Sequence, residues 1–142
     1  MVHLDDIIEK VLSYYPTANV DMIWNAYMAC ARSHQGQMRM SGGPFLSHPL
    51  EVAHILAQLK MDPTSVAAGL LHDIVEDTST KIEALRDYFG DEVAALVDGV
   101  PKLTKMEFSS TEEQQAENLR KMVLAMAKDI RVLIIKLADR LH

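Results

Sequence analysis

The sequence contains a single cysteine, Cys30, which excludes an internal disulfide and a zinc site built from cysteines alone. It has no excess of basic residues, since 14 lysines and arginines face 20 aspartates and glutamates and leave a net charge of −6. A general nucleic-acid binder is usually basic, so the charge disfavours that class. The sequence also lacks a long apolar run. The longest, such as residues 132–135, cannot span a membrane, and the N-terminus resembles no signal peptide.

The composition that remains is typical of one globular domain. Hydrophobic residues make up 49% of the 142 residues and charged residues 24%, which excludes intrinsic disorder. At roughly 150 residues per domain, the chain forms one domain with a sizeable core. One unpaired cysteine fits a reducing compartment.

Apolar residues recur at helical spacing along most of the chain, and no segment alternates as a half-buried strand does. Residues 132–137 could form a buried strand on composition alone, but the apolar positions from 130 to 141 fit a helix better. We predict an all-α fold with helices at residues 4–14, 20–33, 49–60, 63–77, 80–89, 91–100, 111–128 and 130–142, and with a loop at 35–44 and a joint at 102–110. The pattern stops at residue 142 without a helix stop signal, so we expect a domain cut from a longer protein.

The predicted helix at 63–77 combines a small, apolar middle with an acidic end. In a continuous helix, His72 would stack on Glu76 and Asp73 on Asp77, which places one imidazole and three carboxylates along one edge. Crowded carboxylates in a half-buried setting stay ionised only beside a cation, and otherwise some take up protons. The pattern therefore predicts a divalent metal site, and an exposed acidic helix end is the alternative.

Further ligands can be sought elsewhere in the sequence. His48 lies at a loop-to-helix junction, and Asp139 is a charged residue within an apolar helix. Asp139 could instead form a salt bridge with Lys136 or Arg140. Together with residues 72–73, these side chains would offer two imidazoles and two carboxylates, which suit a borderline divalent ion such as Mn, Fe, Co, Ni or Zn. Two further coordination positions could then hold water and substrate.

The order of these residues resembles a known pattern. His48, then the pair at 72–73, then Asp139 is similar to the H…HD…D pattern of the HD phosphohydrolase superfamily. The surrounding sequence, from about residue 26 to the end, resembles the hydrolase domain of RelA/SpoT homologues. The similar segments are residues 34–39, 41–45, 48–50, 71–78, 89–93, 98–105 and 136–142. A lone His-Asp pair is weak evidence, whereas this series of matches is specific.

The resemblance implies an all-α HD-domain helical bundle, a single hydrolase domain over residues 1–142, and a cytoplasmic, Mn²⁺-dependent guanosine-3′,5′-bis(diphosphate) 3′-pyrophosphohydrolase. Such an enzyme degrades the stringent-response alarmones ppGpp and pppGpp to GDP or GTP and pyrophosphate. The roles that the resemblance implies are metal ligation by His48, His72, Asp73 and Asp139, activation of water by Glu76 and Asp77, and nucleotide contact by Arg39 and Ser41. The expected partner is a guanine nucleotide, with no nucleic acid and no membrane.

A few positions depart from the family pattern. Met40 stands where a second basic residue is usual, Gly43 replaces a usual Glu, and Pro101 replaces a usual Thr. The family motif continues beyond residues 141–142 with an Asn that faces the nucleotide, so we expect the chain as it stands to hydrolyse ppGpp poorly or not at all. Met40 and Gly43 leave open an HD phosphohydrolase for another nucleotide. A regulatory domain that binds alarmone or metal without turnover is the non-enzymatic alternative.

Overall fold

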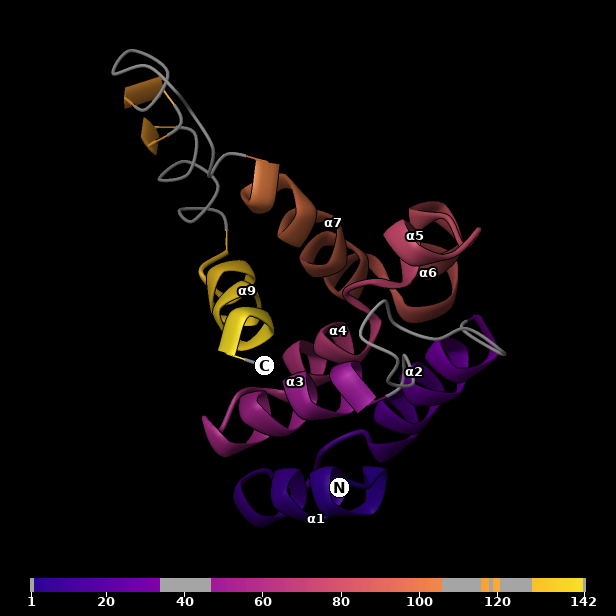
Figure 1. Ribbon diagram of the computed structural model, residues 1–142. Helices are drawn as coiled ribbons and strands as arrows, with labels where there is room; N and C mark the ends of the chain where they lie inside the picture. Colours follow the sequence, from indigo (N-terminus) through magenta and orange to yellow (C-terminus); the bar gives the residue numbers. More distant parts are fainter. Residues whose placement is uncertain (1, 34–46, 106–115, 118, 121–128, 142) are drawn as a thin grey trace.

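The computed structural model describes residues 2–33, 47–105, 116–117, 119–120 and 129–141 of the chain. Within these ranges every regular element is an α-helix and no strand occurs, which confirms the predicted all-α fold class (Figure 1). The labelled helices are α1 (Leu4–Tyr14), α2 (Val20–Ser33), α3 (Ser47–Gln58), α4 (Pro63–Leu71), α5 (Ile74–Asp77), α6 (Ile82–Phe89), α7 (Asp91–Lys105) and α9 (Arg131–Leu141). In the part of the chain described, no helix combines the length and the apolar character needed to cross a bilayer.

The central element of the fold is α4, which contacts α2, α3, α7 and α9. Every residue of α4 except Thr64 is buried. The helix begins where Asp62 accepts a hydrogen bond from the backbone N–H of Ser65, and a proline occupies the first helical position. Small residues let α3 approach closely, since a methyl group added at Gly69 would lie 2.5 Å from Leu56 Cδ1. The small, apolar middle seen in the sequence therefore forms the buried axis of the bundle.

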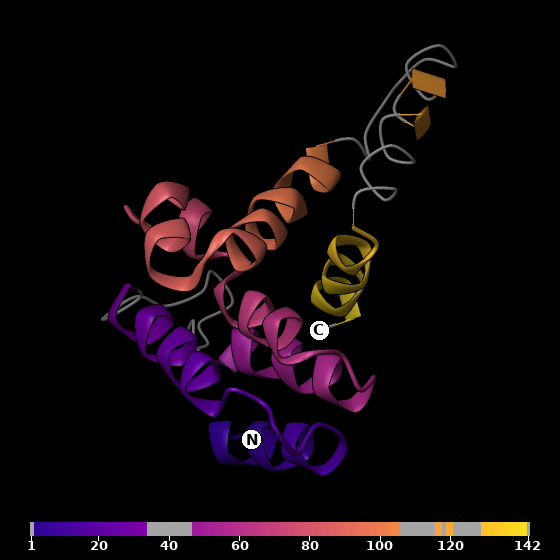
Figure 2. The ribbon, with the colours of Figure 1, turned by 180° about the vertical axis from the view of Figure 1, so that it is seen from behind.

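The other helices surround α4. In the two opposite views, α2 and α9 lie on opposite sides of it, and α1 lies beneath α2 and α3 (Figures 1 and 2). The C-terminal end of α9 approaches α3 and α4 (Figures 1 and 2). This arrangement brings the start of α3, the end of α4 and the end of α9 to one place.

Two predicted helix ends differ from the structure by about five residues or more. The helix expected at 63–77 stops at Leu71, and the one-turn helix α5 begins only at Ile74. The reason is that the His72 side chain hydrogen-bonds through Nδ1 to the Gly69 carbonyl at 2.7 Å, and so competes for an oxygen that a continuing helix would use. Asp73, at φ −97° and ψ −4°, lies outside both helices.

The second wrong end concerns α7, which we expected to stop at residue 100. The helix continues through Pro101 to Lys105. An interior proline costs about 3 kcal/mol because it removes a hydrogen bond and crowds the preceding turn. The buried apolar face of α7 offsets this cost, since it packs against α4, α6 and α9; this face consists of Val93, Ala94, Leu96, Val97 and Val100.

The remaining helix predictions have different outcomes. The bounds expected for α1 and α2 are confirmed, and α3 lies two residues earlier than expected at both ends. The loop at 35–44, which contains Arg39 and Ser41, lies outside the described residues. So does most of the helix expected at 111–128, of which residues 116–117 and 119–120 are helical.

Candidate metal centre

Four side chains from distant parts of the sequence meet at one end of α4. His48 comes from the first turn of α3, His72 and Asp73 follow α4 directly, and Asp139 lies near the end of α9. One ligand atom from each residue lies within 4.8 Å of all the others. These are the four residues for which the sequence suggested metal ligation, and the structure brings all of them together.

The distances within this four-residue cluster are short. His48 Nε2 donates to Asp139 Oδ1 at 2.6 Å, and His72 Nε2 lies 3.2 Å from the same oxygen. Asp73 Oδ2 lies 3.0 Å from His72 Nε2 and 3.9 Å from His48 Nε2. The two imidazole rings are 5.4 Å apart and inclined at 62°. Both Nε2 atoms and one oxygen of each carboxylate therefore face a common point.

The cluster is closed on its histidine side and open on its carboxylate side. His48 is 4% exposed and His72 2%, whereas the side chains of Asp73 and Asp139 are 31% and 20% exposed. Two carboxylates balance the charge of a divalent cation, and two imidazoles suit a borderline one. The donor set therefore fits a divalent metal ion that would be accessible to a substrate from the carboxylate side.

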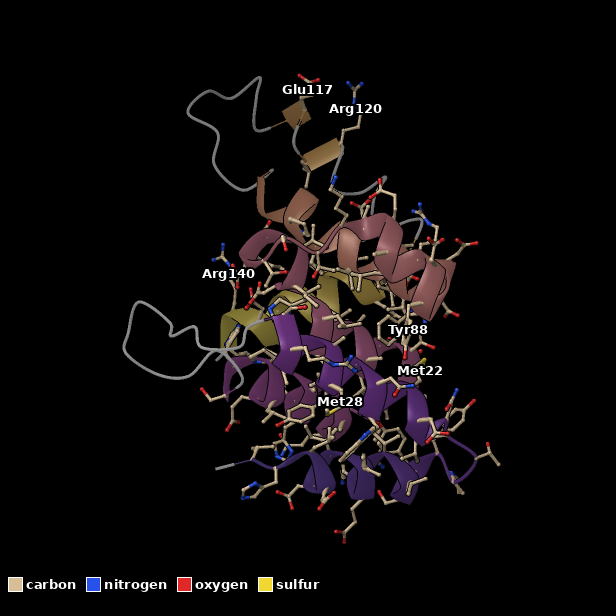
Figure 3. The ribbon with its side chains drawn as sticks, turned by 90° about the vertical axis from the view of Figure 1, so that its right-hand side faces the viewer. Met22, Met28, Tyr88, Glu117, Arg120 and Arg140 are labelled. Atoms are coloured by element: carbon tan, nitrogen blue, oxygen red, sulfur yellow. The ribbon has the colours of Figure 1, made fainter. Side chains whose placement is uncertain are left out.

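Neighbouring groups orient two of these side chains. The Nδ1–H of His72 donates to the Gly69 carbonyl, which leaves Nε2 as the nitrogen that can bind a metal. Lys136 Nζ donates to Asp139 Oδ2 at 3.2 Å, so it contacts the oxygen that the histidines do not use. The salt bridge considered as an alternative for Asp139 thus exists and is compatible with metal ligation. Arg140, the other cation considered, is exposed and projects from α9 (Figure 3).

Replacing Lys136 with Met should lower the affinity for Mn²⁺ about 10–100-fold, because loss of an outer partner of a ligand typically has this effect. The Lys136 side chain is only 13% exposed, so its ion pair with Asp139 is poorly screened. Titration of the chain with Mn²⁺, followed by electron paramagnetic resonance, measures the affinity. Lys81→Met, at an exposed lysine that caps the start of α6, is the matched control. Equal affinities of K136M and the unmodified chain would contradict an orienting role.

Without a metal, the cluster holds protons. Burial alone would lower the pKa of His72, but hydrogen bonds to Asp139 and Asp73 outweigh burial and raise that pKa from 6.5 to about 10. Burial would raise the pKa of Asp139, yet hydrogen bonds from His48 and His72 hold it well below its usual range. An imidazolium between carboxylates therefore replaces the cation in the metal-free protein.

This protonation predicts the pH dependence of stability in the metal-free chain. Because the folded pKa of His72 lies above the unfolded value, its contribution is complete below about pH 6.5 and is lost as pH rises toward 10. Ionised Asp139 also stabilises the folded chain, but the pH dependence of its contribution is opposite. This contribution is complete above about pH 3.8 and is lost as the pH falls below that value.

Urea unfolding in the presence of a chelator tests this prediction, and maximal stability is expected between about pH 4 and pH 6.5. Mn²⁺ must displace the proton on His72 Nε2, so it should stabilise the protein more at pH 8 than at pH 6. His72→Asn should flatten the alkaline side of the metal-free profile. A metal-free stability that rises steadily from pH 6.5 to pH 9 would contradict the assigned protonation.

The acidic pair Glu76 and Asp77 does not belong to the four-residue cluster. Both residues are exposed on α5, and Asp77 still follows Asp73 by one helical turn, since its backbone N–H donates to the Asp73 carbonyl at 2.9 Å. The interruption after Leu71 removes the continuous helix that was expected to carry His72 on the same edge. Cys30 of α2 is buried nearby. Burial, followed by the charges of Asp73 and Asp77, raises the pKa of its thiol to about 12. A thiol that stays protonated is not available as a metal ligand.

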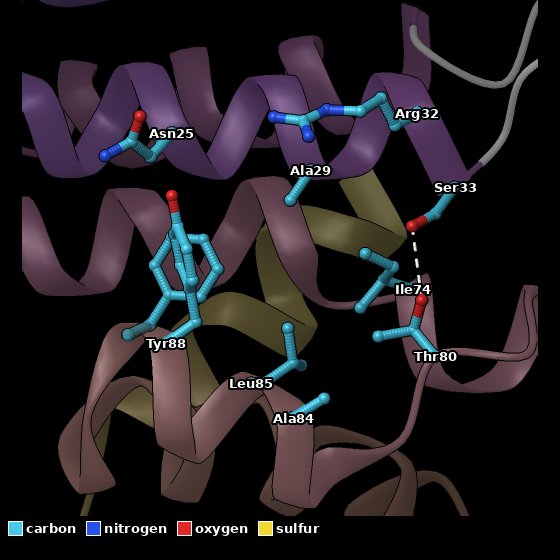
Figure 4. A pocket seen from close by; sticks show the side chains of 10 residues that line it. Asn25, Ala29, Arg32, Ser33, Ile74, Thr80, Ala84, Leu85 and Tyr88 are labelled. Carbon is cyan, nitrogen blue, oxygen red and sulfur yellow. Dashed lines mark hydrogen bonds between the residues drawn. The ribbon is translucent and has the colours of Figure 1, made fainter.

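A cavity of about 300 Å³ lies between α2 and α6, and Ile74 at the start of α5 also lines it (Figure 4). Ser33 Oγ and Thr80 Oγ1 are hydrogen-bonded at 3.2 Å along its edge, so the end of α2 holds the segment that follows α5 (Figure 4). Ile74 anchors the start of α5 in the core, since it is 1% exposed. The turn that carries the acidic pair is therefore fixed at both ends. Sequence reasoning missed this hydrogen bond because serine and threonine are common in loops and these two are 47 residues apart.

Comparison with known proteins shows which family the chain is similar to. The HD domain family matches residues 26–142. The chain is 56% identical over 135 residues to the GTP pyrophosphokinase of Myxococcus xanthus, covering 93% of this chain and 18% of that protein. It is 44% identical over 142 residues to the bifunctional (p)ppGpp synthase/hydrolase SpoT of Escherichia coli K12, covering 100% of this chain and 20% of the relative.

A solved structure is similar to this chain as well. A metazoan orthologue of SpoT, described as hydrolysing ppGpp, superposes with a TM-score of 0.62 at 29% sequence identity, covering 84% of this chain and 66% of that one. The chain spans about a fifth of the length of the two curated bacterial relatives above. The similarity therefore concerns one domain of much longer proteins.

Proposed function

The chain belongs to the HD domain family, as the hydrolase-type domain of a RelA/SpoT homologue, and from this membership we propose that it hydrolyses (p)ppGpp to GDP or GTP and pyrophosphate. The observation that carries the proposal is the convergence of two imidazoles and two carboxylates within 4.8 Å. Hydrolysis adds water across the bond between the ribose 3′ oxygen and the pyrophosphate group. The relatives named as pyrophosphokinases share the same domain, but the cluster in this domain is suited to hydrolysis.

In this proposal, His48, His72, Asp73 and Asp139 hold the metal, which we take to be Mn²⁺. When bound, a divalent ion supplies Lewis acidity that polarises the phosphoryl oxygens and offsets their charge. The Gly69 carbonyl keeps His72 Nε2 directed at the site, and Lys136 keeps Asp139 Oδ1 directed there. The more exposed carboxylate side is where the pyrophosphate group approaches.

We assign Glu76 and Asp77 to the water. Both carboxylates are exposed on the first turn after Asp73, and neither belongs to the four-residue cluster, so both can contact solvent water. One of them takes the proton as water attacks phosphorus, and the proton is then delivered to the departing 3′ oxygen. In this assignment Asp73 binds the metal, whereas Glu76 and Asp77 transfer the proton. The two roles account for three carboxylates within residues 73–77.

Nucleotide contact is assigned to Arg39 and Ser41, which lie outside the described residues. A chain with a net charge of −6 repels a polyanion over most of its surface, so local cations and the metal have to attract the substrate. The partner is then a guanine nucleotide with phosphates at both the 5′ and the 3′ position. Alarmone turnover is intracellular chemistry, so we also propose a cytoplasmic location.

Release of pyrophosphate from ppGpp, measured with and without Mn²⁺, tests the proposed function. We expect release from ppGpp and pppGpp only with metal, and none from GTP, because GTP has no 3′ pyrophosphate. A panel of other nucleotides under the same conditions examines the consequence of Met40 and Gly43. Faster hydrolysis of a nucleotide without a 3′ pyrophosphate would support the second HD phosphohydrolase candidate. Binding of ppGpp and metal without turnover would support a regulatory domain instead.

A further inference from the structure

The first residue of α9 joins three parts of the fold through its guanidinium group. Arg131 Nη1 donates to Asp62 Oδ2 at 2.9 Å and to Glu92 Oε1 at 2.7 Å. Its Nη2 donates to Asp129 Oδ2 at 2.7 Å, and its Nε contacts the same carboxylate. We refer to these four residues as the Arg131 junction. It connects the start of α9 with the N-cap of α4 and the first turn of α7.

The charge balance makes Arg131 the essential member of the junction. One guanidinium, 24% exposed, faces three carboxylates whose side chains are 29–60% exposed. Without it, three negative charges would remain together and repel one another at the starts of three helices. A lysine could not replace it fully, because an ammonium group lacks the planar fork that contacts several carboxylates at once.

The junction lies at the opposite end of α4 and α9 from the metal cluster. Asp62 and Arg131 are joined at one end of this helix pair, and His72 and Asp139 lie 3.2 Å apart at the other. The two helices therefore run side by side in the same direction. Asp139 follows Arg131 by eight residues, or about 12 Å along a helix. Because a helix is stiff over this length, a shift at its start displaces its end.

A second contact fixes the same turn of α9. Val132 sits against Gly99 of α7, where an added methyl group would lie 2.9 Å from Val132 Cγ2 and 3.1 Å from Cγ1. Val132 is 8% exposed. The start of α9 is thus located by an ion-pair network on one residue and by close packing on the next.

We propose that Arg131 is a positioning residue that sets where α9 lies along α4 and thereby places Asp139 at the metal cluster. The inference rests on the proposed metal site. It assigns to Arg131 no contact with substrate or metal, since it acts through Asp139 alone. Loss of Arg131 should consequently weaken metal binding only while Asp139 is present to be misplaced.

A double-mutant cycle on the full chain tests this dependence. The Mn²⁺ dissociation constant is measured by electron paramagnetic resonance for the unmodified chain, R131M, D139N and the double variant. R131M alone should lower Mn²⁺ affinity about 10–100-fold. In the D139N background, the same change should alter affinity by less than about twofold, because Arg131 acts through Asp139 and the two changes are therefore not additive. R131K should fall between R131M and the unmodified chain.

Two further variants keep the test specific. R86M removes an exposed ion pair with Asp91, which is not a member of the Arg131 junction, and should leave Mn²⁺ affinity unchanged. Gly99→Ala pushes on Val132 without changing any charge, and it should reproduce the R131M pattern. If far-ultraviolet circular dichroism shows that R131M does not fold, the Mn²⁺ affinities of G99A with and without Asp139 test the positioning role in its place.

The possible outcomes separate this inference from the proposed function. If the unmodified chain does not bind Mn²⁺, the metal site and the positioning role both fail. If it binds and R131M binds within about twofold of it, the positioning role alone fails. An equal loss with and without Asp139 would mean that Arg131 only supports the fold, and would also overturn the inference.

Discussion

Asn in place of Asp139 is expected to lower Mn²⁺ affinity by more than about 100-fold, beyond the roughly 10–100-fold effect of losing an outer partner. Pyrophosphate release should fall to background. Among the carboxylate oxygens of the described residues, only Asp139 Oδ1 lies within 3.2 Å of both His48 Nε2 and His72 Nε2, so its replacement affects both histidine ligands at once. An amide carries no charge, and a divalent ion would then face two buried imidazoles with Asp73 as the only remaining carboxylate.

Isothermal titration with Mn²⁺ and an assay of pyrophosphate release measure the two effects. Asp87→Asn makes the same chemical change at an exposed position of α6, and it should bind and turn over like the unmodified chain. Urea unfolding of D139N at pH 5 shows whether the variant is folded. Full Mn²⁺ affinity in folded D139N would remove Asp139 from the ligand set and leave its contacts with the histidines as a structural ion pair.

Helix positions followed from the sequence where the apolar period is uninterrupted. The bounds of α1 and α2 were predictable because Pro16 and the residues around it break a clear stripe. The end of α4 was not, because its cause is a contact between the His72 side chain and a backbone carbonyl. The extension of α7 through Pro101 was also not predictable, because it depends on helices that pack against it from elsewhere in the chain.

The candidate site was predictable in its members but not in its geometry. Residue types and order identified His48, the pair at 72–73 and Asp139, and the fold brings these four together. The sequence suggested that Glu76 and Asp77 share an edge with this pair along one continuous helix, whereas the helix stops at Leu71 and neither residue belongs to the four-residue cluster. Contacts between residues distant in sequence, such as Arg131 with Asp62, carry no local pattern and could be found only in the structure.

Removing the acidic pair should have the second large effect. Glu76→Gln and Asp77→Asn are each expected to lower the turnover of ppGpp about 10²–10⁴-fold, the usual contribution of a general acid or base. Mn²⁺ affinity should stay close to that of the unmodified chain, because neither residue belongs to the four-residue cluster. Both side chains are exposed, so the amides should be accommodated without a large loss of stability.

The separation of turnover from metal affinity is what distinguishes proton transfer from ligation at α5. Each variant is titrated with Mn²⁺ and assayed at saturating metal, so that weaker binding cannot pass for slower chemistry. Glu83→Gln, an equally exposed carboxylate on α6, provides the matched control and should change neither quantity. A parallel loss of Mn²⁺ affinity in E76Q or D77N would make that residue a ligand, which would require α5 to turn toward the cluster when the metal binds. Unchanged turnover in both variants would mean that another residue acts as the base and that Glu76 and Asp77 are solvent-exposed carboxylates without a catalytic role.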